Sequence, residues 1–380
     1  MRIALCYDRI NKFGGAERVL TALHELWPDA PIYTLTYSPG TAQWADGWTI
    51  RTSFLQKVPI LGRFHELFPP LAPLAWEHFN LTEYDVVVSV TSAEAKSILI
   101  RPGAVHISYC LTPTRYYWSG YNNYLANPGM GILNGLVRFV FPYFSYILRV
   151  YDFYHAQRPE VLVGISRAVQ ARILKYYRRD THYIYPPVIT EPRKHLIKSI
   201  HKKHFLVVSR LVPYKRIDIV IEAFNRLGWP LHIVGTGSQE SILKRSSRPN
   251  ITFRGFISDE ELGAEYESAI AVIFPTDEDF GIVPIEAQAH GIPVVAYRKG
   301  GALETVREGI TGAFFDAQTC DSLYSLLFSS SNSGDFTSAI SYFSRFSPES
   351  CIDNASRFST DSFQRQFLAL VKESAPISSL

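Results

Sequence analysis

The segment DEDFGIVPIEAQAHGIPVVA, residues 277–296, holds two glutamates eight positions apart, Glu278 and Glu286. The run AIAVIFPT precedes the first glutamate and PVVAY follows the second, and such short continuous apolar runs are typical of strands buried on both faces of a sheet. Pro284 suits the first position of a helix, where a missing N–H costs nothing, and Gly291 suits the position just after a helix ends. The segment therefore predicts a strand, a loop, a short helix and a second strand.

The same alternation extends upstream to residue 204. Four apolar runs follow one another here: HFLVVS, LHIVG, NITFRG and IAVIFP. A segment of helical character, YKRIDIVIEAFNRL, lies between the first and second runs, and another, SDEELGAEYESA, lies between the third and fourth. Strand–helix–strand alternation favours right-handed crossovers and a parallel sheet. In the first half of the chain we expect strands at 3–7, 84–90, 105–110 and 161–166, with helices at 16–26, 131–155 and 167–179. The predicted fold class is α/β, with two doubly wound, Rossmann-like domains facing each other across a cleft.

A length of 380 residues also favours two domains. The polar, basic segment EPRKHLIKSIHKK, residues 191–203, is the expected linker. It separates an N-terminal domain (1–190) from a C-terminal domain (204–340). We expect the remaining residues, 341–380, to form helices that pack back towards the N-terminal domain. Ligands of such sheets bind at the carboxyl ends of the strands, so the cleft between the two domains is the expected site.

Bulk composition narrows the class of protein. Apolar residues make up 47% of the chain and charged residues 19%, as in folded globular proteins. The net charge of +3 is too small to indicate a nucleic-acid partner. The four cysteines form no zinc or redox motif, which favours a reducing, cytoplasmic location. No signal peptide is recognisable, and no apolar run reaches the roughly 18 residues that a membrane-spanning helix needs.

Two loops carry the candidate chemistry. In the first, the amides of Phe280, Gly281, Ile282 and Val283 are expected to point into the cleft at a helix N-terminus, which favours an anion such as phosphate. Glu278 and Glu286 flank these amides, and a carboxylate can accept two hydrogen bonds from a vicinal diol. The second loop lies in VSRLVPYKRID, residues 208–218, where Arg210 and Lys215 follow another strand. Opposite the first loop, these cations would form a diphosphate clamp, and the whole set suits a nucleotide sugar.

Simpler interpretations stay open for these residues. Glu286 could merely complement the helix dipole while Glu278 is solvated, and Arg210 and Lys215 could be solvated loop cations. The triplet Asp277-Glu278-Asp279 could instead be a D-x-D metal site.

The ordered set of motifs resembles retaining glycosyltransferases of the GT-B architecture, specifically family 4. The resemblance rests on EDFGIVPIE, SRLVPYK and FGGAERV, with IVGTGSQ, FRGFISDEEL and KGGALETV in the expected order. It covers nearly the whole chain. The segments SYCLTPTRYYW and YYRRDTHYIYPPV are similar to a bacterial branch that builds surface polysaccharides or glycolipids, often with mannose.

The resemblance implies a role for each candidate. Glu286 would bind the nucleotide ribose and Glu278 a hydroxyl of the donor sugar, while Arg210 and Lys215 would neutralise the departing diphosphate. The catalytic set is therefore expected to be Arg210, Lys215 and Glu278. The family needs no cofactor and no obligate metal, and its retaining reaction is thought to be a front-face substitution. The favoured donor is GDP-mannose, with UDP-sugars next, and the acceptor would be a saccharide or a lipid-linked saccharide.

Further donor-site residues follow from the same resemblance. Gly14 and Gly15 would let the backbone approach the phosphates, and an ordinary helix-entry turn is the alternative. Phe256 and Ile257 would pack against the base, and core packing is the alternative.

The acceptor side departs from the family, because Leu111 stands where relatives often have histidine. We expect His106, Arg115, Tyr116 and Trp118 on this side. His106 could instead be a core histidine, and the other three could be structural.

Residues 138–179 combine eight cations with aromatic side chains, which suggests peripheral contact with anionic lipid; a core helix with a solvated basic face is the alternative. The eight cations are Arg138, Arg149, Arg158, Arg167, Arg172, Lys175, Arg178 and Arg179. Two rival functions stay open for the chain: a nucleotide-sugar 2-epimerase of similar fold, and a catalytically inactive sugar-binding protein.

Overall fold

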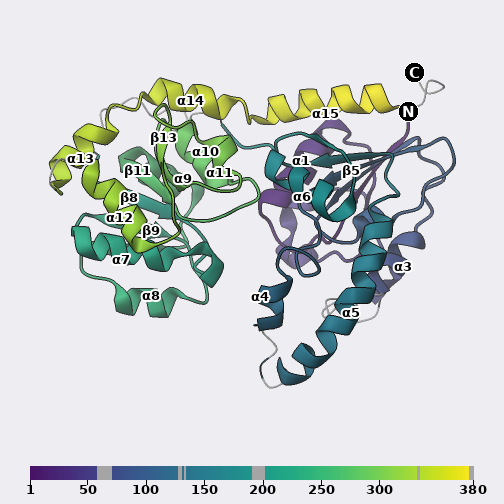
Figure 1. The fold of residues 1–380 in the computed structure, drawn as a ribbon. Coiled ribbons are helices and arrows are strands. Elements are labelled where there is room, and N and C mark those ends of the chain that lie inside the picture. The colour runs from purple at the N-terminus through teal and green to yellow at the C-terminus, as the bar shows by residue number, and fades with distance from the viewer. Residues whose placement is uncertain (58–70, 127–130, 132–133, 191–201, 332–333, 376–380) are drawn as a thin grey trace. The chain divides into compact units, whose positions relative to one another are not determined.

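The computed structural model describes residues 1–57, 71–126, 131, 134–190, 202–331 and 334–375 (Figure 1). The chain divides into two compact units, which are taken in turn below. Unit 1 comprises residues 1–187 and 363–380, and unit 2 comprises residues 188–362. Most of the expected linker, residues 191–201, lies outside the described residues.

Unit 1 contains a seven-stranded, wholly parallel sheet in the order β3-β2-β1-β4-β5-β6-β7. Its strands are β1 (Ile3–Tyr7), β2 (Ile32–Thr34), β3 (Ile50–Thr52), β4 (Val86–Thr91), β5 (Val105–Cys110), β6 (Val161–Gly164) and β7 (His182–Tyr183). Its α-helices are α1 (Gly15–Leu26), α3 (Leu71–Glu77), α4 (Tyr121–Ala126), α5 (Asn134–His155) and α6 (Arg167–Tyr177). The central strands β1 and β4 are buried along their whole length, which explains their largely apolar sequences; Ser89 and Thr91 are the polar residues of β4.

Unit 2 contains a six-stranded parallel sheet in the order β10-β9-β8-β11-β12-β13. Its strands are β8 (His204–Val208), β9 (Leu231–Val234), β10 (Ile251–Gly255), β11 (Ala269–Phe274), β12 (Val294–Tyr297) and β13 (Gly312–Phe315). Its α-helices are α7 (Ile217–Leu227), α8 (Glu240–Ser246), α9 (Asp259–Ser268), α10 (Ile282–Ala289), α11 (Ala302–Thr305), α12 (Cys320–Ser329), α13 (Phe336–Phe343) and α14 (Pro348–Ser356). The strand order reverses between β8 and β11, the point where parallel sheets of this kind bind ligands.

The opening segment folds as a strand, a loop, a helix and a strand, with one difference. Helix α10 begins at Ile282, so Pro284 is its third residue and not its first. The proline is still tolerated there, because the first four N–H groups of a helix have no intrahelical acceptor. Gly291 has φ 72° and directly follows the capping residue His290, as expected for a glycine after a helix end.

The C-terminal helices differ from the expected division at residue 341, which falls inside α13 and marks no boundary. Helix α14 belongs to unit 2, where Asn354 donates to Gln288 Oε1 on α10 at 2.6 Å. The last helix, α15 (Thr360–Ser374), joins unit 1 from Phe363 onward. There Phe363 and Phe367 pack edge-on against Tyr109 of β5, with ring centroids 5.7 and 6.0 Å away. Residues from Phe363 onward thus belong to unit 1, whereas α13 and α14 belong to unit 2.

Two further observations bear on the bulk predictions. All four cysteines are buried and none forms a disulfide. Among the helices within the described ranges, none combines the length and the apolar character needed to cross a membrane.

Candidate functional site

The switch point of unit 2 brings the two predicted loops together. Lys215, in the loop after β8, forms an ion pair with Glu278, in the loop after β11. The two side chains are 14% and 24% exposed, so water can still reach the pair. Thr276 Oγ1 donates to the carbonyl of Lys215 at 3.1 Å, which ties the two loops a second time. The sequence assigned Lys215 and Glu278 to different parts of one ligand, and without a ligand they neutralise each other.

Two glycines after β9, Gly235 and Gly237, pack against the backbone of the β8 loop on either side of Arg210. A Cβ on Gly235 would lie 2.0 Å from the carbonyl oxygen of Ser209, and one on Gly237 would lie 2.3 Å from that of Leu211. Because glycine has no Cβ, the backbone of IVGTGSQ can lie directly against the β8 loop. There the Leu211 N–H donates to the Thr236 carbonyl at 2.9 Å. This close approach of the two backbones explains why glycines occupy both positions.

The arginine itself is oriented from the same loop. Its Nη2 donates to the hydroxyl of Tyr214 at 2.5 Å, and the side chain is exposed. The guanidinium of Arg210 is therefore accessible to an incoming anion.

A second glycine pair, Gly300-Gly301, packs against the β11 loop. A Cβ on Gly300 would lie 2.4 Å from the Glu278 carbonyl oxygen, and one on Gly301 would lie 2.1 Å from that of Phe280. The Gly301 N–H donates to the Glu278 carbonyl at 2.8 Å. The motif KGGALETV therefore supports the loop that carries Glu278. The sequence alone indicated no role for these two glycines.

The same loop contains the alternative D-x-D triplet. Asp277 pairs with Lys299 at 3.1 Å, Glu278 pairs with Lys215, and Asp279 is buried. Two of the three carboxylates therefore already face a cation, which does not favour a divalent metal at this position.

The N-terminus of α10 follows directly. Gly281 has φ 88°, a conformation that favours glycine, and a Cβ there would make a tight contact of 3.2 Å with the Phe274 ring. Ile282 and Val283 open the helix, where backbone N–H groups have no intrahelical acceptor and the helix dipole favours an anion. The side chain of Phe280 is buried and packs against Phe358 with centroids 5.6 Å apart, so only its backbone is available to a ligand.

Glu286 lies one turn further along α10. Its Oε2 accepts from the Tyr266 hydroxyl at 3.2 Å, and the side chain is half-buried. Tyr266 stacks on His290 with centroids 5.1 Å apart. These contacts fix the orientation of the carboxylate.

Phe256 and Ile257, the two candidates for contact with the base, have different surroundings. Phe256 is 89% exposed, which excludes core packing for this side chain. Ile257 packs against the core of unit 2. The preceding Gly255 has φ 68°, so the chain turns sharply before the exposed phenylalanine.

In unit 1, Gly14 precedes α1 and Gly15 is its first residue. Gly14 has extended backbone, with φ −174°, so its conformation alone does not require glycine. A Cβ on Gly14 would approach Glu17 Oε2 at 3.3 Å, a mild contact with a flexible side chain. Both the helix-entry turn and the phosphate-approach interpretation therefore stay open.

A buried polar network lies at the carboxyl ends of β1 and β4, and the sequence analysis did not identify it. Asp8 Oδ1 accepts from the Thr91 hydroxyl at 2.8 Å and from the N–H groups of Glu94 and Ala95. Glu94 in turn pairs with Arg9 at 3.1 Å. Burial raises the pKa of Glu94, while Arg9 opposes that shift.

Lys96 and Asp152 form the second part of this network, with Nζ 2.7 Å from Oδ1. Burial opposes the charged form of Lys96, yet the Asp152 carboxylate outweighs it and the pKa of Lys96 is raised. Asp152 Oδ2 also accepts from Trp118 Nε1 at 2.6 Å and from the Tyr177 hydroxyl at 2.8 Å. No sequence pattern connects these positions, which lie on different elements.

The network holds two of the expected acceptor-side residues. Trp118 is fixed by Asp152 and stacks on Tyr176 with centroids 5.1 Å apart. The Tyr116 hydroxyl donates to Glu94 Oε1 at 2.9 Å. Arg115 is half-buried and its carbonyl accepts from the Gly120 N–H at 2.7 Å. The side-chain contacts give Trp118 and Tyr116 a structural role, which does not exclude contact with a substrate, whereas the bond from Gly120 involves only the backbone of Arg115.

His106 is in the interior of unit 1. Its side chain is 1% exposed, and Nε2 is hydrogen-bonded to the Ser89 hydroxyl at 2.8 Å. Burial lowers the pKa of His106 to about 3, and Arg179 and Arg158 add to the effect. The environment is that of the core histidine named as the alternative, and a buried ring does not contact a substrate. The neighbouring Leu111 is half-buried, with its N–H bonded to the Thr91 carbonyl at 2.8 Å.

Helix α5 has an exposed apolar face, in the segment where a surface of mixed basic and aromatic side chains was expected. Side chains spaced three or four residues apart form one stripe, the α5 face, which comprises Leu136, Phe139, Tyr143, Tyr146, Val150 and Tyr154. Several of the expected cations bind within the fold instead: Arg149 donates to the Tyr117 carbonyl, Arg158 pairs with Glu77, and Arg179 donates to the Pro159 carbonyl. The α5 face is therefore mainly aromatic.

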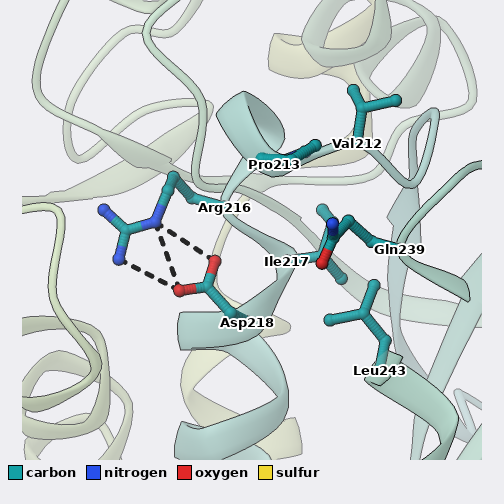
Figure 2. Close-up of a pocket in the computed structure, with 7 residues that line it drawn as sticks. All are labelled: Val212, Pro213, Arg216, Ile217, Asp218, Gln239 and Leu243. Atoms are coloured by element: carbon teal, nitrogen blue, oxygen red, sulfur yellow. Dashed lines mark hydrogen bonds and ion pairs between the residues drawn. The ribbon is translucent and has the colours of Figure 1, made fainter. Parts of the chain in front are cut away.

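A small pocket of about 260 Å³ lies beside the β8 loop (Figure 2). Its lining residues are Val212, Pro213, Arg216, Ile217, Asp218, Gln239 and Leu243. Arg216 and Asp218 form a bidentate pair, with Nε and Nη2 each 3.1 Å from a carboxylate oxygen. Arg210, Lys215 and Glu278 are not part of the lining. The pocket thus shares the β8 loop with the candidate site but not the side chains of Arg210, Lys215 and Glu278.

Comparison with known proteins supports the fold. Residues 189–328 match the family described as "Glycosyl transferases group 1". An Anabaena protein solved in complex with UDP has a TM-score of 0.69 at 18% identity, over 98% of this chain and 100% of that one. Sucrose-phosphate synthase of Thermosynechococcus elongatus has a TM-score of 0.64 at 15% identity, over 98% and 99%. The predicted α/β fold of two parallel-sheet, Rossmann-like units is confirmed.

Similarity to curated proteins is confined to part of the chain. A GDP-mannose-dependent α-(1-6)-phosphatidylinositol monomannoside mannosyltransferase of Mycolicibacterium smegmatis is 37% identical over 134 residues. A D-inositol 3-phosphate glycosyltransferase of a Mycobacterium species is 36% identical over 137 residues. These matches cover 30% and 31% of this chain, and 35% and 31% of the relatives. The chain thus matches about a third of the length of these relatives.

Proposed function

We propose that the protein is a glycosyltransferase that moves a sugar from a nucleotide diphosphate sugar to a saccharide or lipid-linked acceptor. One observation carries the proposal: Arg210, the Lys215–Glu278 pair and the N-terminus of α10 converge at the switch point of unit 2. The matched family region, residues 189–328, contains all of them. Cations and free backbone N–H groups suit a diphosphate, and carboxylates suit sugar hydroxyls.

Each group has a distinct role in the proposed reaction. Arg210 and Lys215 stabilise the negative charge that grows on the diphosphate as the glycosidic bond breaks. Glu278 leaves Lys215 to accept a hydrogen bond from the donor sugar. The backbone N–H groups at the start of α10 hold the phosphates, and Glu286 accepts hydrogen bonds from the ribose.

We propose a retaining reaction without an obligate metal or cofactor. In this reaction the departing phosphate helps to deprotonate the acceptor, so the protein acts mainly by positioning and charge stabilisation. The pairing of Asp277 and Glu278 with lysines supports the metal-free proposal. We expect the transferase activity to survive an excess of chelator. Loss of activity with chelator, restored by manganese or magnesium, would refute the metal-free proposal.

GDP-mannose is the proposed donor, with UDP-sugars as the second choice. The mannosyltransferase from M. smegmatis, whose name specifies GDP-mannose, is 37% identical over 134 residues and supports the first choice. The Anabaena structure holds UDP but supports only the fold, at 18% identity. The exposed ring of Phe256 is the proposed platform for the base.

We further propose that the α5 face makes peripheral contact with a membrane that carries the lipid-linked acceptor. An amphipathic helix with an aromatic face can lie in the headgroup region of a bilayer. Phe139 is 71% exposed, Tyr143 67% and Tyr146 69%, which is unusual for large apolar side chains in contact with water alone. This contact would place the protein at the inner face of the cell membrane.

A donor screen tests the proposed function. The full chain is incubated with GDP-, UDP- and ADP-sugars, and melting temperature and release of the nucleoside diphosphate are both measured. A ligand at 100 times its Kd adds about 2.7 kcal/mol to stability, which gives a clear thermal shift. Release of nucleoside diphosphate with sugar transfer supports the transferase. Isomerised donor without release would identify the 2-epimerase, and binding without turnover would identify the inactive sugar-binding protein.

A further inference from the structure

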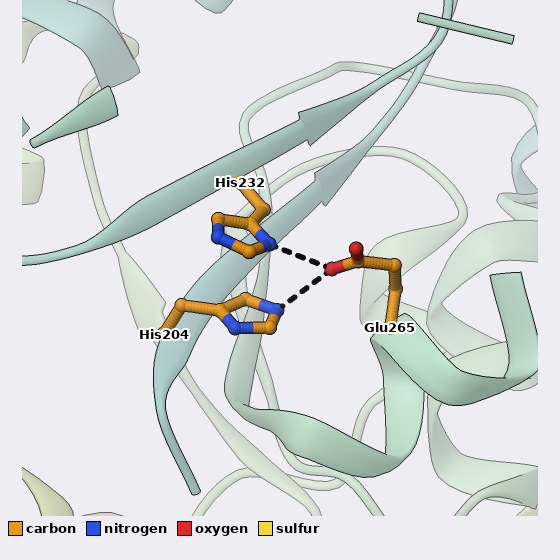
Figure 3. A group of neighbouring side chains, drawn as sticks. All are labelled: His204, His232 and Glu265. Atoms are coloured by element: carbon orange, nitrogen blue, oxygen red, sulfur yellow. Dashed lines mark hydrogen bonds and ion pairs between the residues drawn. The ribbon is translucent and has the colours of Figure 1, made fainter. Parts of the chain in front are cut away.

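Two histidines and a glutamate form a cluster in unit 2, away from the proposed donor site (Figure 3). His204 is the first residue of β8, His232 is the second residue of β9, and Glu265 belongs to α9. Their ligand atoms all lie within 4.8 Å of one another. Arg210 and Glu278 follow the carboxyl ends of the strands, whereas His204 begins a strand, so the cluster lies at the opposite, amino-terminal edge of the sheet.

Strand pairing explains why the two histidines meet. β8 and β9 are parallel neighbours, and Leu206 is the partner of His232. His204 lies two residues before Leu206, so its side chain is on the same face of the sheet. The two imidazoles stack with centroids 3.7 Å apart and planes 16° from parallel.

Both rings point at one carboxylate oxygen, as Figure 3 shows. His232 Nδ1 lies 2.8 Å from Glu265 Oε2, and His204 Nε2 lies 3.0 Å from the same atom. His204 is 3% exposed, and among the described residues its Nε2 finds no hydrogen bond of acceptable geometry despite this short distance. A buried nitrogen in this condition costs stability unless another ligand satisfies it.

From this geometry we propose that His204, His232 and Glu265 bind a divalent transition metal, with Zn²⁺ the best-suited ion. Two imidazoles and one carboxylate are established zinc ligands, and they leave a fourth position for water. Zinc bonds of about 2.0–2.1 Å in a tetrahedron require ligand atoms roughly 3.3 Å apart. The separations of 2.8 and 3.0 Å would therefore open by about 0.3–0.5 Å, and one of the two stacked imidazoles would also turn so that both ring nitrogens face the ion.

Arg254 lies beside the cluster and orients the carboxylate of Glu265. Its Nε lies 2.9 Å from Glu265 Oε1, so the arginine holds one oxygen and leaves Oε2 for the metal. Partners of this kind fix the orientation of metal ligands. The side chain of His232 is 27% exposed, which provides a route for an ion to enter.

The position indicates a structural role. A metal would link β8, β9 and α9. The site lies next to the residue before β8, Lys203, whose N–H donates to the Ser268 carbonyl at 2.9 Å. Binding should therefore raise the stability of unit 2 and leave donor affinity unchanged.

Calorimetric titration of ZnCl₂ into the full chain, after removal of metal with a chelator, tests the proposal. The expected result is saturable binding of a single zinc ion per chain with a rise in melting temperature. His232→Gln should weaken binding by about tenfold or more. His182→Gln removes an exposed histidine of unit 1 and should leave binding unchanged. No saturable binding by the unaltered chain, or equal loss in both variants, would overturn the proposal.

X-ray absorption of the zinc-loaded chain is a second measurement that needs no variant. Two imidazole ligands with the rest oxygen are expected. Sulfur ligation would assign the zinc to cysteine and refute the site. Neither measurement depends on transferase activity, so the proposed function can fail without affecting this result.

Discussion

Lys215→Ala separates a role in the reaction from a role in pairing with Glu278. The Lys215 side chain is 14% exposed, so its charge acts in a partly desolvated site. If it stabilises charge that develops on the diphosphate, its loss should lower kcat about 10²-fold, or about 2.7 kcal/mol. The stability cost should be smaller, about 1 kcal/mol, because Glu278 is 24% exposed and can turn to water. The variant should therefore fold and bind donor but turn over slowly.

A double variant distinguishes the two roles. If Lys215 only neutralised Glu278, then Lys215→Ala combined with Glu278→Gln would be as active as Glu278→Gln alone. The proposed role predicts that the double variant is slower by a further factor of about ten or more. The assay is steady-state kinetics at saturating donor, with folding checked by circular dichroism.

Lys299→Ala is the matched control. Lys299 pairs with Asp277 in the same loop at 3.1 Å, but its side chain is 59% exposed. Loss of such an exposed pair should change kcat by only about twofold or less. Wild-type kcat in Lys215→Ala, or an equal loss in Lys299→Ala, would refute the assignment of Lys215 to the diphosphate.

Three further predictions address the remaining parts of the proposal. Glu286→Ala should raise the donor KM with little change in kcat, because the ribose contact is the same in ground and transition states; a mainly kcat effect would assign Glu286 to the reacting sugar instead. Gly301→Ala forces a Cβ to within 2.1 Å of the Phe280 carbonyl oxygen and should destabilise unit 2 by about 1–3 kcal/mol in a denaturation experiment, whereas Gly40→Ala, with no atom within 4 Å of its Cβ, should not. Phe139→Ser with Tyr143→Ser should reduce sedimentation with anionic vesicles, and unchanged sedimentation would exclude the α5 face as the membrane contact.

The strands of both sheets were predictable where apolar runs are long and continuous. Strands β8 and β11 agree with the sequence interpretation because burial on both faces favours continuous apolar runs, and His204 at the start of β8 is the one polar residue in these two strands. Strands β2 and β3 were not predicted from the sequence, because three residues are too few to show a hydrophobic pattern. The start of α10 was displaced by two residues because Pro284 is compatible with several positions in the first turn.

Contacts between distant residues were beyond the reach of sequence patterns. The motifs identified Lys215 and Glu278 individually, but their direct pairing depends on the loop geometry that Gly300 and Gly301 impose. The buried network around Asp152 likewise joins elements that no spacing rule connects.

Exposure could not be read from the sequence either. Phe256 and Ile257 are adjacent apolar residues, yet only the first is exposed.

The most direct test of the central claim is a crystal structure of the chain with the nucleoside diphosphate of its donor. The account predicts that the terminal phosphate oxygens lie within hydrogen-bond distance of Arg210 and Lys215, and that Glu278 has separated from Lys215. A diphosphate bound elsewhere, such as in the pocket lined by Val212 and Gln239, with the Lys215–Glu278 pair intact, would contradict it.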